Sequence, residues 1–270
     1  KSVALPAEHG GWGLSAEPGL LGLLVSPSWA GAAIAVAAVV AFLVRTPLKL
    51  AVIDRRRGRT LDRTRLATRI AAAEMVLLSA LALTALALSG PRWLIPIAVA
   101  APFILVELWF DIRSRGRRLL PELAGSVGIC SVAAAVAMAG GAEARLAAAL
   151  WLILAARAVA TVAFARIQVV RFRKELQRSR PAGRDGELSG RSDRTSTQSS
   201  DWAQSAGLTL AVGAVALSPQ VVAGAAFIAV VALGELVAVR RPPVRPKVLG
   251  FTQLGIGLGL VAVTALSAAL

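Results

Sequence analysis

The chain has 270 residues, of which 56% are hydrophobic, and its mean hydropathy is +0.69. A water-soluble domain of this length would be far more polar, so the composition predicts an integral membrane protein. The net charge of +15 does not indicate a nucleic-acid partner, because the cations lie between apolar runs and no zinc-finger spacing accompanies them. Cys130 and His9 are single residues of their types, which excludes an intrachain disulfide and a multi-histidine metal site.

Nine apolar segments follow one another and predict an all-α, polytopic transmembrane helical bundle of about nine spans. A span needs about 20 apolar residues, with a usual range of roughly 17–25. Most segments reach that length, whereas the first and the seventh are shorter and are candidates for half-inserted helices. In chain order the segments are 12–25, 29–44, 70–88, 93–110, 119–139, 146–165, 203–217, 221–239 and 249–270.

The cations predict the topology. All but three of the 30 Lys and Arg residues are Lys1 or lie in four connections, namely 45–69, 111–118, 166–203 and 240–247. The alternate connections are short and carry few charges. This asymmetry is the positive-inside pattern, so we expect a cytoplasmic N-terminus, basic loops on the cytoplasmic face and a bilayer with anionic headgroups as partner.

One polar stretch interrupts the apolar pattern. Residues 179–201 are rich in Ser, Arg and Gly and have no periodicity, which predicts a disordered cytoplasmic loop. It separates a six-span region, 1–178, from a three-span region, 202–270, within one membrane domain.

Ionisable residues inside apolar segments are the best functional candidates, because each costs free energy to hold in lipid. Arg157 is the deepest, nine residues before Arg166, which is about 14 Å along a helix. We expect it to face the bundle and to pair with Glu17 or, as second choice, Glu107. The alternative is an ion pair that only fixes helix packing. The ionisable residues within segments are Glu17, Glu74, Glu107, Glu122, Arg157 and Glu235.

A second group of charges lies where the fourth segment ends. Glu107 and Asp111 share one helix face at i, i+4, Arg113 follows directly, and Glu122 opens the fifth segment. Carboxylates and guanidinium groups at one membrane depth can bind a Mg²⁺–phosphate group. The alternative is a solvated loop in which the acids offset dense positive charge.

The third candidate is the N-terminal stretch 7–13, Ala-Glu-His-Gly-Gly-Trp-Gly. Its glycines allow tight turns or close approach to a ligand, and His9 can titrate near neutral pH. Trp12 suits the membrane–water interface. The alternative is an interfacial anchor with a flexible turn.

Several short motifs together resemble the YwiC-like family of bacterial membrane proteins. The motifs are Glu8-His9-Gly10-Gly11-Trp12-Gly13 with Glu17-Pro18 and Gly22, Arg45-Thr46-Pro47, Asp111-Ile112-Arg113-Ser114-Arg115-Gly116, Glu122-Leu123-Ala124-Gly125, Arg157-Ala158-Val159 with Arg166, and Arg245-Pro246-Lys247-Val248-Leu249-Gly250. The resemblance covers almost the whole chain except 179–201. It implies a multi-pass protein of the bacterial cytoplasmic membrane and an architecture without a known reaction.

A weaker resemblance is to UbiA-type membrane prenyltransferases. The stretch 111–125, DIRSRGRRLLPELAG, is similar in style to their second Asp-rich motif, while their first motif is absent. Only this resemblance implies Mg²⁺ as a cofactor.

These observations lead to one functional expectation and three alternatives. We expect a cytoplasm-facing polar cavity that binds an anionic or lipid-linked, phosphate-bearing substrate. The alternatives are a UbiA-like transferase, a proton-coupled transporter and a non-catalytic membrane scaffold. The candidate binding residues are His9, Trp12, Glu17, Arg45, Glu107, Asp111, Arg113, Glu122, Arg157, Arg166 and Lys247.

Overall fold

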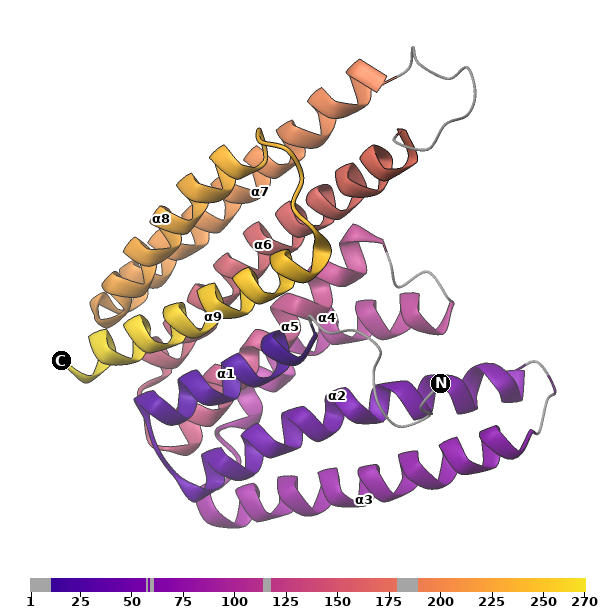
Figure 1. Ribbon diagram of the computed structural model, residues 1–270. Helices are drawn as coiled ribbons and strands as arrows, with labels where there is room; N and C mark the ends of the chain where they lie inside the picture. The colour runs from indigo at the N-terminus through magenta and orange to yellow at the C-terminus, as the bar shows by residue number, and fades with distance from the viewer. Residues whose placement is uncertain (1–10, 57, 59–60, 114–117, 179–188) are drawn as a thin grey trace.

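The computed structural model describes residues 11–56, 58, 61–113, 118–178 and 189–270. Over these residues the chain forms nine α-helices and one short 3-10 helix, as the nine apolar segments predict (Figure 1). The helices are α1 (Gly11–Val25), α2 (Trp29–Arg56), α3 (Asp62–Ser89), α4 (Leu94–Ile112), α5 (Leu119–Ala139), α6 (Ala144–Arg178), α7 (Ser189–Leu217), η1 (Pro219–Val221), α8 (Val222–Ala238) and α9 (Pro246–Ala269).

Seven stretches of the described residues are long and apolar enough to cross a membrane: α2 to α6, η1 with α8, and α9. The protein is therefore a multi-pass integral membrane protein. α1 has 15 residues and rises about 22 Å, less than the roughly 30 Å of a hydrocarbon core. α7 is also outside the seven, because its apolar part is confined to its second half. α1 and α7 are therefore the two helices outside the seven candidate spans, and they correspond to the two segments that the sequence predicts to be marginal.

Four helices extend beyond their apolar segments into the basic connections. α2 continues to Arg56 rather than ending at residue 44, α3 begins at Asp62 and α6 continues to Arg178. α7 begins at Ser189, inside the stretch 179–201 for which we predict disorder, whereas 179–188 lies outside the described residues. Hydropathy marks where lipid ends, but an existing helix gains one hydrogen bond for each further residue and continues into water. The division into six-span and three-span regions stays a prediction.

The extensions of α2 and α3 are joined by a polar contact near their connection. Asp54 is buried and accepts a hydrogen bond from Thr64 Oγ1 at 2.8 Å. The Asp54 carboxylate also receives the Arg63 guanidinium, with Nη2 3.1 Å from Oδ1. The two helices therefore stay together as an antiparallel hairpin past the apolar segments.

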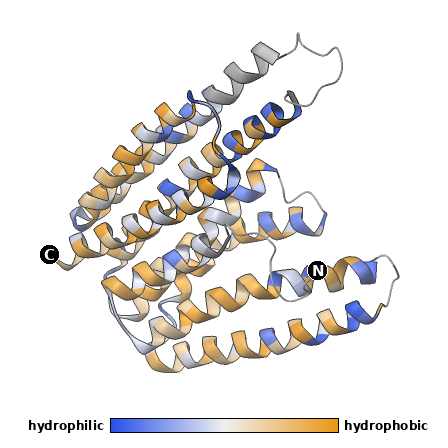
Figure 2. Ribbon diagram, in the orientation of Figure 1, coloured by the Kyte–Doolittle hydropathy of each residue, from blue (hydrophilic) through white to orange (hydrophobic). Residues whose placement is uncertain are grey.

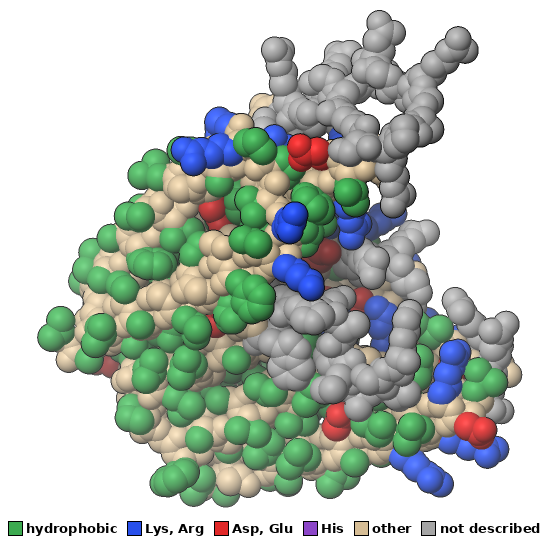
Figure 3. Space-filling view, viewed as in Figure 1, with side chains coloured by type: hydrophobic (Ala, Val, Ile, Leu, Met, Phe, Trp, Pro, Cys, Tyr) green, Lys and Arg blue, Asp and Glu red, His purple; other side chains and the backbone are tan. Residues whose placement is uncertain are grey.

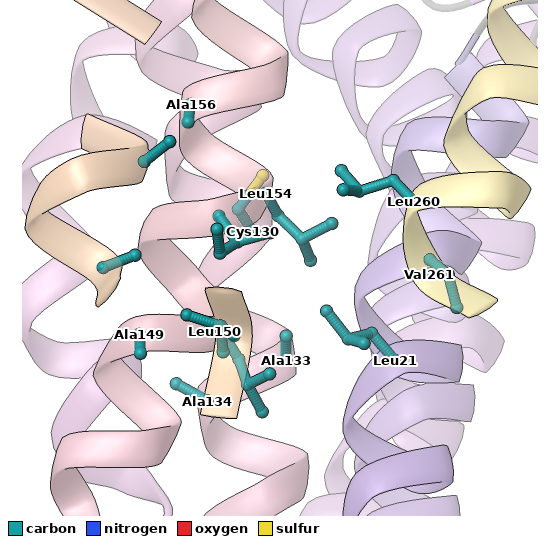
Figure 4. Packing of buried hydrophobic residues seen from close by; sticks show 14 of the residues in the cluster. Leu21, Cys130, Ala133, Ala134, Ala149, Leu150, Leu154, Ala156, Leu260 and Val261 are labelled. Carbon is teal, nitrogen blue, oxygen red and sulfur yellow. The ribbon is translucent and has the colours of Figure 1, made fainter. Parts of the chain in front are cut away.

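α5 and α6 form the centre of the bundle, since more than half of each apolar stretch is buried, whereas less than a fifth of the apolar stretch is buried in α3 and in α4. α1 lies between α5 and α9 and also contacts α2 (Figure 1). The main core is dominated by Ala, Leu and Val from α1 and α5 to α9. Leu21 of α1 and Leu260 of α9 point toward Cys130 and Leu154 of the central pair (Figure 4).

Small residues allow α1 to approach α5 closely. A Cβ atom at Gly22 would lie 2.6 Å from Val136 Cβ and 2.8 Å from the Ala133 carbonyl oxygen, and no real Cβ tolerates either distance. Because one obstacle is backbone, α1 would have to move away to accept a larger residue. The glycine thus sets the distance between these two helices, as small residues do in many membrane bundles.

Charge is segregated along the bundle. The helix ends that flank the four basic connections lie at one end, which we call the basic end, and apolar residues cover the remainder of the helices (Figures 1 and 2). On the visible face, Lys and Arg side chains gather toward this end and the opposite side is covered by hydrophobic side chains (Figure 3). That the basic end faces the cytoplasm stays a prediction from the positive-inside pattern.

We predict that Arg56→Cys and Arg118→Cys are labelled by a membrane-impermeant maleimide only in inverted vesicles, and Glu143→Cys only in right-side-out vesicles. All three positions are exposed, while the native Cys130 is buried and gives a low background. Labelling of positions 56 and 118 from opposite faces of the membrane would contradict the topology.

We predict that Gly22→Ala destabilises the bundle by about 1–3 kcal/mol, the usual cost of overpacking a close contact. The matched control is Gly213→Ala in α7, where a Cβ would meet nothing within 4 Å. That control should be neutral or stabilising by up to about 1 kcal/mol, because Ala is the better helix former. Melting temperatures in detergent would measure both effects, and equal shifts would show that the α1–α5 contact is not tight.

Candidate functional site

Arg157 in the middle of α6 forms a buried ion pair with Glu17 of α1. Its Nη1 donates to Glu17 Oε2 at 2.5 Å, and the two side chains are only 6% and 4% exposed. The preferred partner predicted from the sequence is thereby confirmed. A side chain at Gly257 of α9 would overlap both partners, and one at Gly13 would crowd Glu17. Two glycines therefore make the space that the ion pair occupies.

The ion pair continues into a network that joins five helices. Arg157 Nη2 donates to the backbone carbonyl of Gln253 in α9 at 2.6 Å. Gln253 Nε2 in turn donates to Glu235 Oε1 of α8 at 2.8 Å, and Gln204 Nε2 of α7 donates to Glu235 Oε2 at 2.6 Å. We call Glu17, Arg157, Gln204, Glu235 and Gln253 the core network. It connects α6 with α1, α7, α8 and α9.

Sequence reasoning singled out three members of the core network and missed both glutamines. Gln204 is 1% exposed and Glu235 is 4% exposed, so the amide is as deeply placed as the carboxylate. A signal was available, because an uncharged polar side chain beside an apolar run also needs a partner in lipid. Gln204 and Gln253 are not ionisable and are therefore not among the residues predicted to need a partner.

A second group of charges lies at the basic end of α2, α4, α5 and α6. Arg45 of α2 contacts both acids of α4: Nη1 is 2.6 Å from Glu107 Oε1, and Nη2 is 2.6 Å from Asp111 Oδ2. Lys49, one turn further along α2, lies 3.1 Å from Asp111 Oδ1. The predicted shared face of Glu107 and Asp111 is therefore real, and it is turned toward two cations.

The same group continues through α5 to α6. Glu107 packs so closely against Gly125 of α5 that any side chain there would overlap its carboxylate. Three residues earlier on α5, Glu122 pairs with Arg166 of α6 at 2.9 Å. We call this group the helix-end cluster; its members are Arg45, Lys49, Glu107, Asp111, Glu122 and Arg166.

The exposure of the two groups differs. In the helix-end cluster the side chains of Arg45, Lys49 and Arg166 are 34%, 39% and 39% exposed, and only Asp111, at 6%, is buried. The helix-end cluster can thus meet solvent or a lipid headgroup without rearrangement, whereas the core network is closed within the bundle.

The remaining candidates lie apart from both groups. Arg113 is exposed and its guanidinium lies 3.9 Å above the Trp109 ring, an arrangement suited to a membrane interface. Lys247 is exposed in the first turn of α9. His9 and the side chain of Trp12 lie outside the described residues. A single cavity lined by all the candidate residues stays a prediction.

The carboxylates of the helix-end cluster form ion pairs with Lys and Arg side chains. Within the part of the chain that the structure describes, no three His, Cys, Asp or Glu side chains lie together as a metal site would require. Glu107 and Asp111 point to Arg45 and Lys49 instead. Both α4 acids therefore contact cationic side chains of α2.

We predict that Arg157→Ala destabilises the protein by about 3–5 kcal/mol, because it leaves Glu17 buried without a cation. Arg166→Ala is the matched control, since its partner Glu122 is 37% exposed and the pair should contribute no more than about 1 kcal/mol. Melting temperatures in detergent would compare them, and Glu17→Gln combined with Arg157→Gln should recover part of the loss. Equal effects of the two Ala variants would show that burial does not distinguish the pairs.

Comparison with known protein families finds a match to the first half of the chain. A family model described as YwiC-like protein matches residues 5–138, which include α1 to α4, nearly all of α5 and therefore Glu17 and most of the helix-end cluster. No curated protein and no solved structure matches the chain. The match confirms, over residues 5–138, the resemblance to the YwiC-like family that the sequence predicts.

Proposed function

We propose that this membrane protein resides in the bacterial cytoplasmic membrane and binds an anionic, phosphate-bearing lipid or lipid-linked substrate at the helix-end cluster. The observation that carries the proposal is the position of Arg45, which is held by Glu107 and Asp111 yet remains one-third exposed at the basic end. A guanidinium that is already oriented loses less entropy when it meets an anion.

Charge balance supports an anionic ligand. The connection 45–69 contains nine Lys and Arg residues against Asp54 and Asp62, and 111–118 contains four Arg residues against Asp111. The contact between Arg45 and Asp111 brings the helix ends of these two connections together. The acids therefore cannot neutralise the region, and an anionic headgroup there gains about 1 kcal/mol from each nearby cation.

The surroundings of the helix-end cluster favour a ligand with an apolar tail. In α4, which provides both acids, only 17% of the apolar stretch is buried. Leu105, Leu108 and Trp109 are 64%, 39% and 56% exposed, so the same helix offers hydrocarbon-facing surface next to the charges. A phosphate group could contact the cluster while its acyl or polyprenyl chain stays in the bilayer along α4. Binding and positioning, without a defined reaction, is the activity that this geometry supports.

We predict that Lys49→Gln weakens binding of a short-chain phosphatidic acid about fivefold, which corresponds to the loss of about 1 kcal/mol from one headgroup cation. Lys49 is the better probe than Arg45, because its removal leaves both Arg45 contacts in place. Arg145→Gln, an exposed cation at the opposite end of α6, is the matched control and should not change the affinity.

Titration of the protein in nanodiscs of zwitterionic lipid would measure both affinities, with inorganic phosphate as a second ligand. Stronger binding of the lipid than of inorganic phosphate is expected for a lipid-linked substrate. Equal affinities would indicate a free phosphate ligand and overturn the lipid part of the proposal. Equal weakening by Lys49→Gln and Arg145→Gln would place the binding outside the helix-end cluster.

A further inference from the structure

A small cavity borders the core network at Arg157 and Gln204. Its volume is about 10 Å³, which is close to the space that one water molecule needs. Most of its wall is apolar and comes from α8 and α9, including Phe227, Ile228 and Leu260. Arg157 and Thr161 of α6 and Gln204 of α7 provide the polar part of the wall.

Each of these three polar residues brings an unsatisfied atom. Arg157 Nε, Thr161 Oγ1 and Gln204 Oε1 are buried and form no hydrogen bond with any described residue. The side chains are also deeply placed, at 6%, 7% and 1% exposed. One atom is a donor, one is an acceptor and the hydroxyl is both, so a water that accepts from Arg157 and donates to Thr161 and Gln204 would satisfy all three.

Glu235, on the other side of Gln204, has surroundings that suit two protonation states. Both of its oxygens accept hydrogen bonds from amide groups, those of Gln204 and Gln253, and the Oε1 atom of each amide is buried without a donor among the described residues. These contacts suit the carboxylate form. Rotation of either amide by 180° would offer Oε1 to Glu235 and would suit the protonated form, which donates one hydrogen bond.

The charged groups around Glu235 are few. α6 contributes Arg157, which is already paired with Glu17 of α1, so this pair carries no net charge. α6 also contributes Arg171, which donates to the Val239 carbonyl at the end of α8. α7 contributes Asp201 one turn before Gln204, and it is paired with Arg240. Gln253 of α9 is neutral, and η1 has no ionisable residue. No described cation pairs with Glu235 directly, which leaves its protonation free to change.

We propose that Glu235 is a reversible protonation site inside the membrane and that one bound water links it, through Gln204, to the Glu17–Arg157 pair. On uptake, hydronium from the basic end transfers a proton to a Glu235 oxygen, which forms the carboxyl O–H bond and leaves a water molecule. Release reverses this transfer. Glu235 lies three residues before the end of α8, about 4.5 Å along the helix, so the path from solvent is short. This inference is independent of phosphate binding at the helix-end cluster.

Infrared difference spectroscopy of the protein in nanodiscs, recorded between acidic and alkaline buffer, tests the protonation site. We expect a carbonyl band of a protonated carboxylic acid that appears at acidic pH and shifts in D₂O. Glu235→Gln should abolish this band, because Gln keeps the size of the side chain but cannot titrate. Glu74→Gln is the matched control, since Glu74 is a membrane carboxyl on α3 outside the core network, and it should leave the band in place. A band retained in Glu235→Gln would overturn the proposal.

A second variant tests the water and does not depend on the stability of Glu235→Gln. Thr161→Val keeps the side-chain shape and removes the hydroxyl from the cavity. We expect it to remove a water O–H band that shifts in H₂¹⁸O and to move the Glu235 carbonyl band. Wild-type and Thr161→Val spectra that agree in both regions would exclude the bound water, and the absence of any pH-dependent carbonyl band in the wild type would exclude the protonation site.

Discussion

The fold depends on a guanidinium group held in a place where hydrocarbon would otherwise surround it. An Arg at the centre of a span costs about 2.5–3.5 kcal/mol on insertion scales when it has no partner. Here Arg157 is saturated on one side by Glu17 and by the Gln253 carbonyl, and the three groups come from different helices. The cost is offset only if α1, α6 and α9 occupy one arrangement, so the ion pair selects that arrangement among other packings of apolar helices.

This constraint explains the position of α1, whose 15 residues rise about 22 Å. On one face of α1, Glu17 forms the ion pair with Arg157. On another face, Gly22 allows close packing against α5. The YwiC-like match ends at residue 138, before α6 begins. The Glu17–Arg157 pair therefore joins the matched region to the helices that follow it, and the core network extends the same link to α7, α8 and α9.

The helix-end cluster and the core network differ in their access to water, and this difference determines how each group of charges is stabilised. At the helix ends, cations and acids can reach water, and pairs such as Arg166–Glu122 remain more than one-third exposed. Deeper in the bundle the same chemistry needs complete enclosure, which glycines and amide side chains provide around Arg157 and Glu235. We therefore propose an external anion as the ligand of the helix-end cluster, and a proton with a single water as the ligands of the core network.

The sequence by itself determined the number and order of the helices, because hydrocarbon requires long apolar runs and rejects the cations between them. It also indicated which residues need partners, and it named Glu17 as the preferred partner of Arg157, with Glu107 as second choice. Only the tertiary structure decided which face each helix turns inward, and hence that Glu107 and Asp111 meet Arg45 while Glu235 meets Gln204 and Gln253. Rotation about a helix axis is set by side-chain packing between helices distant in sequence, and a hydrophobic run that is apolar on all sides carries no record of it.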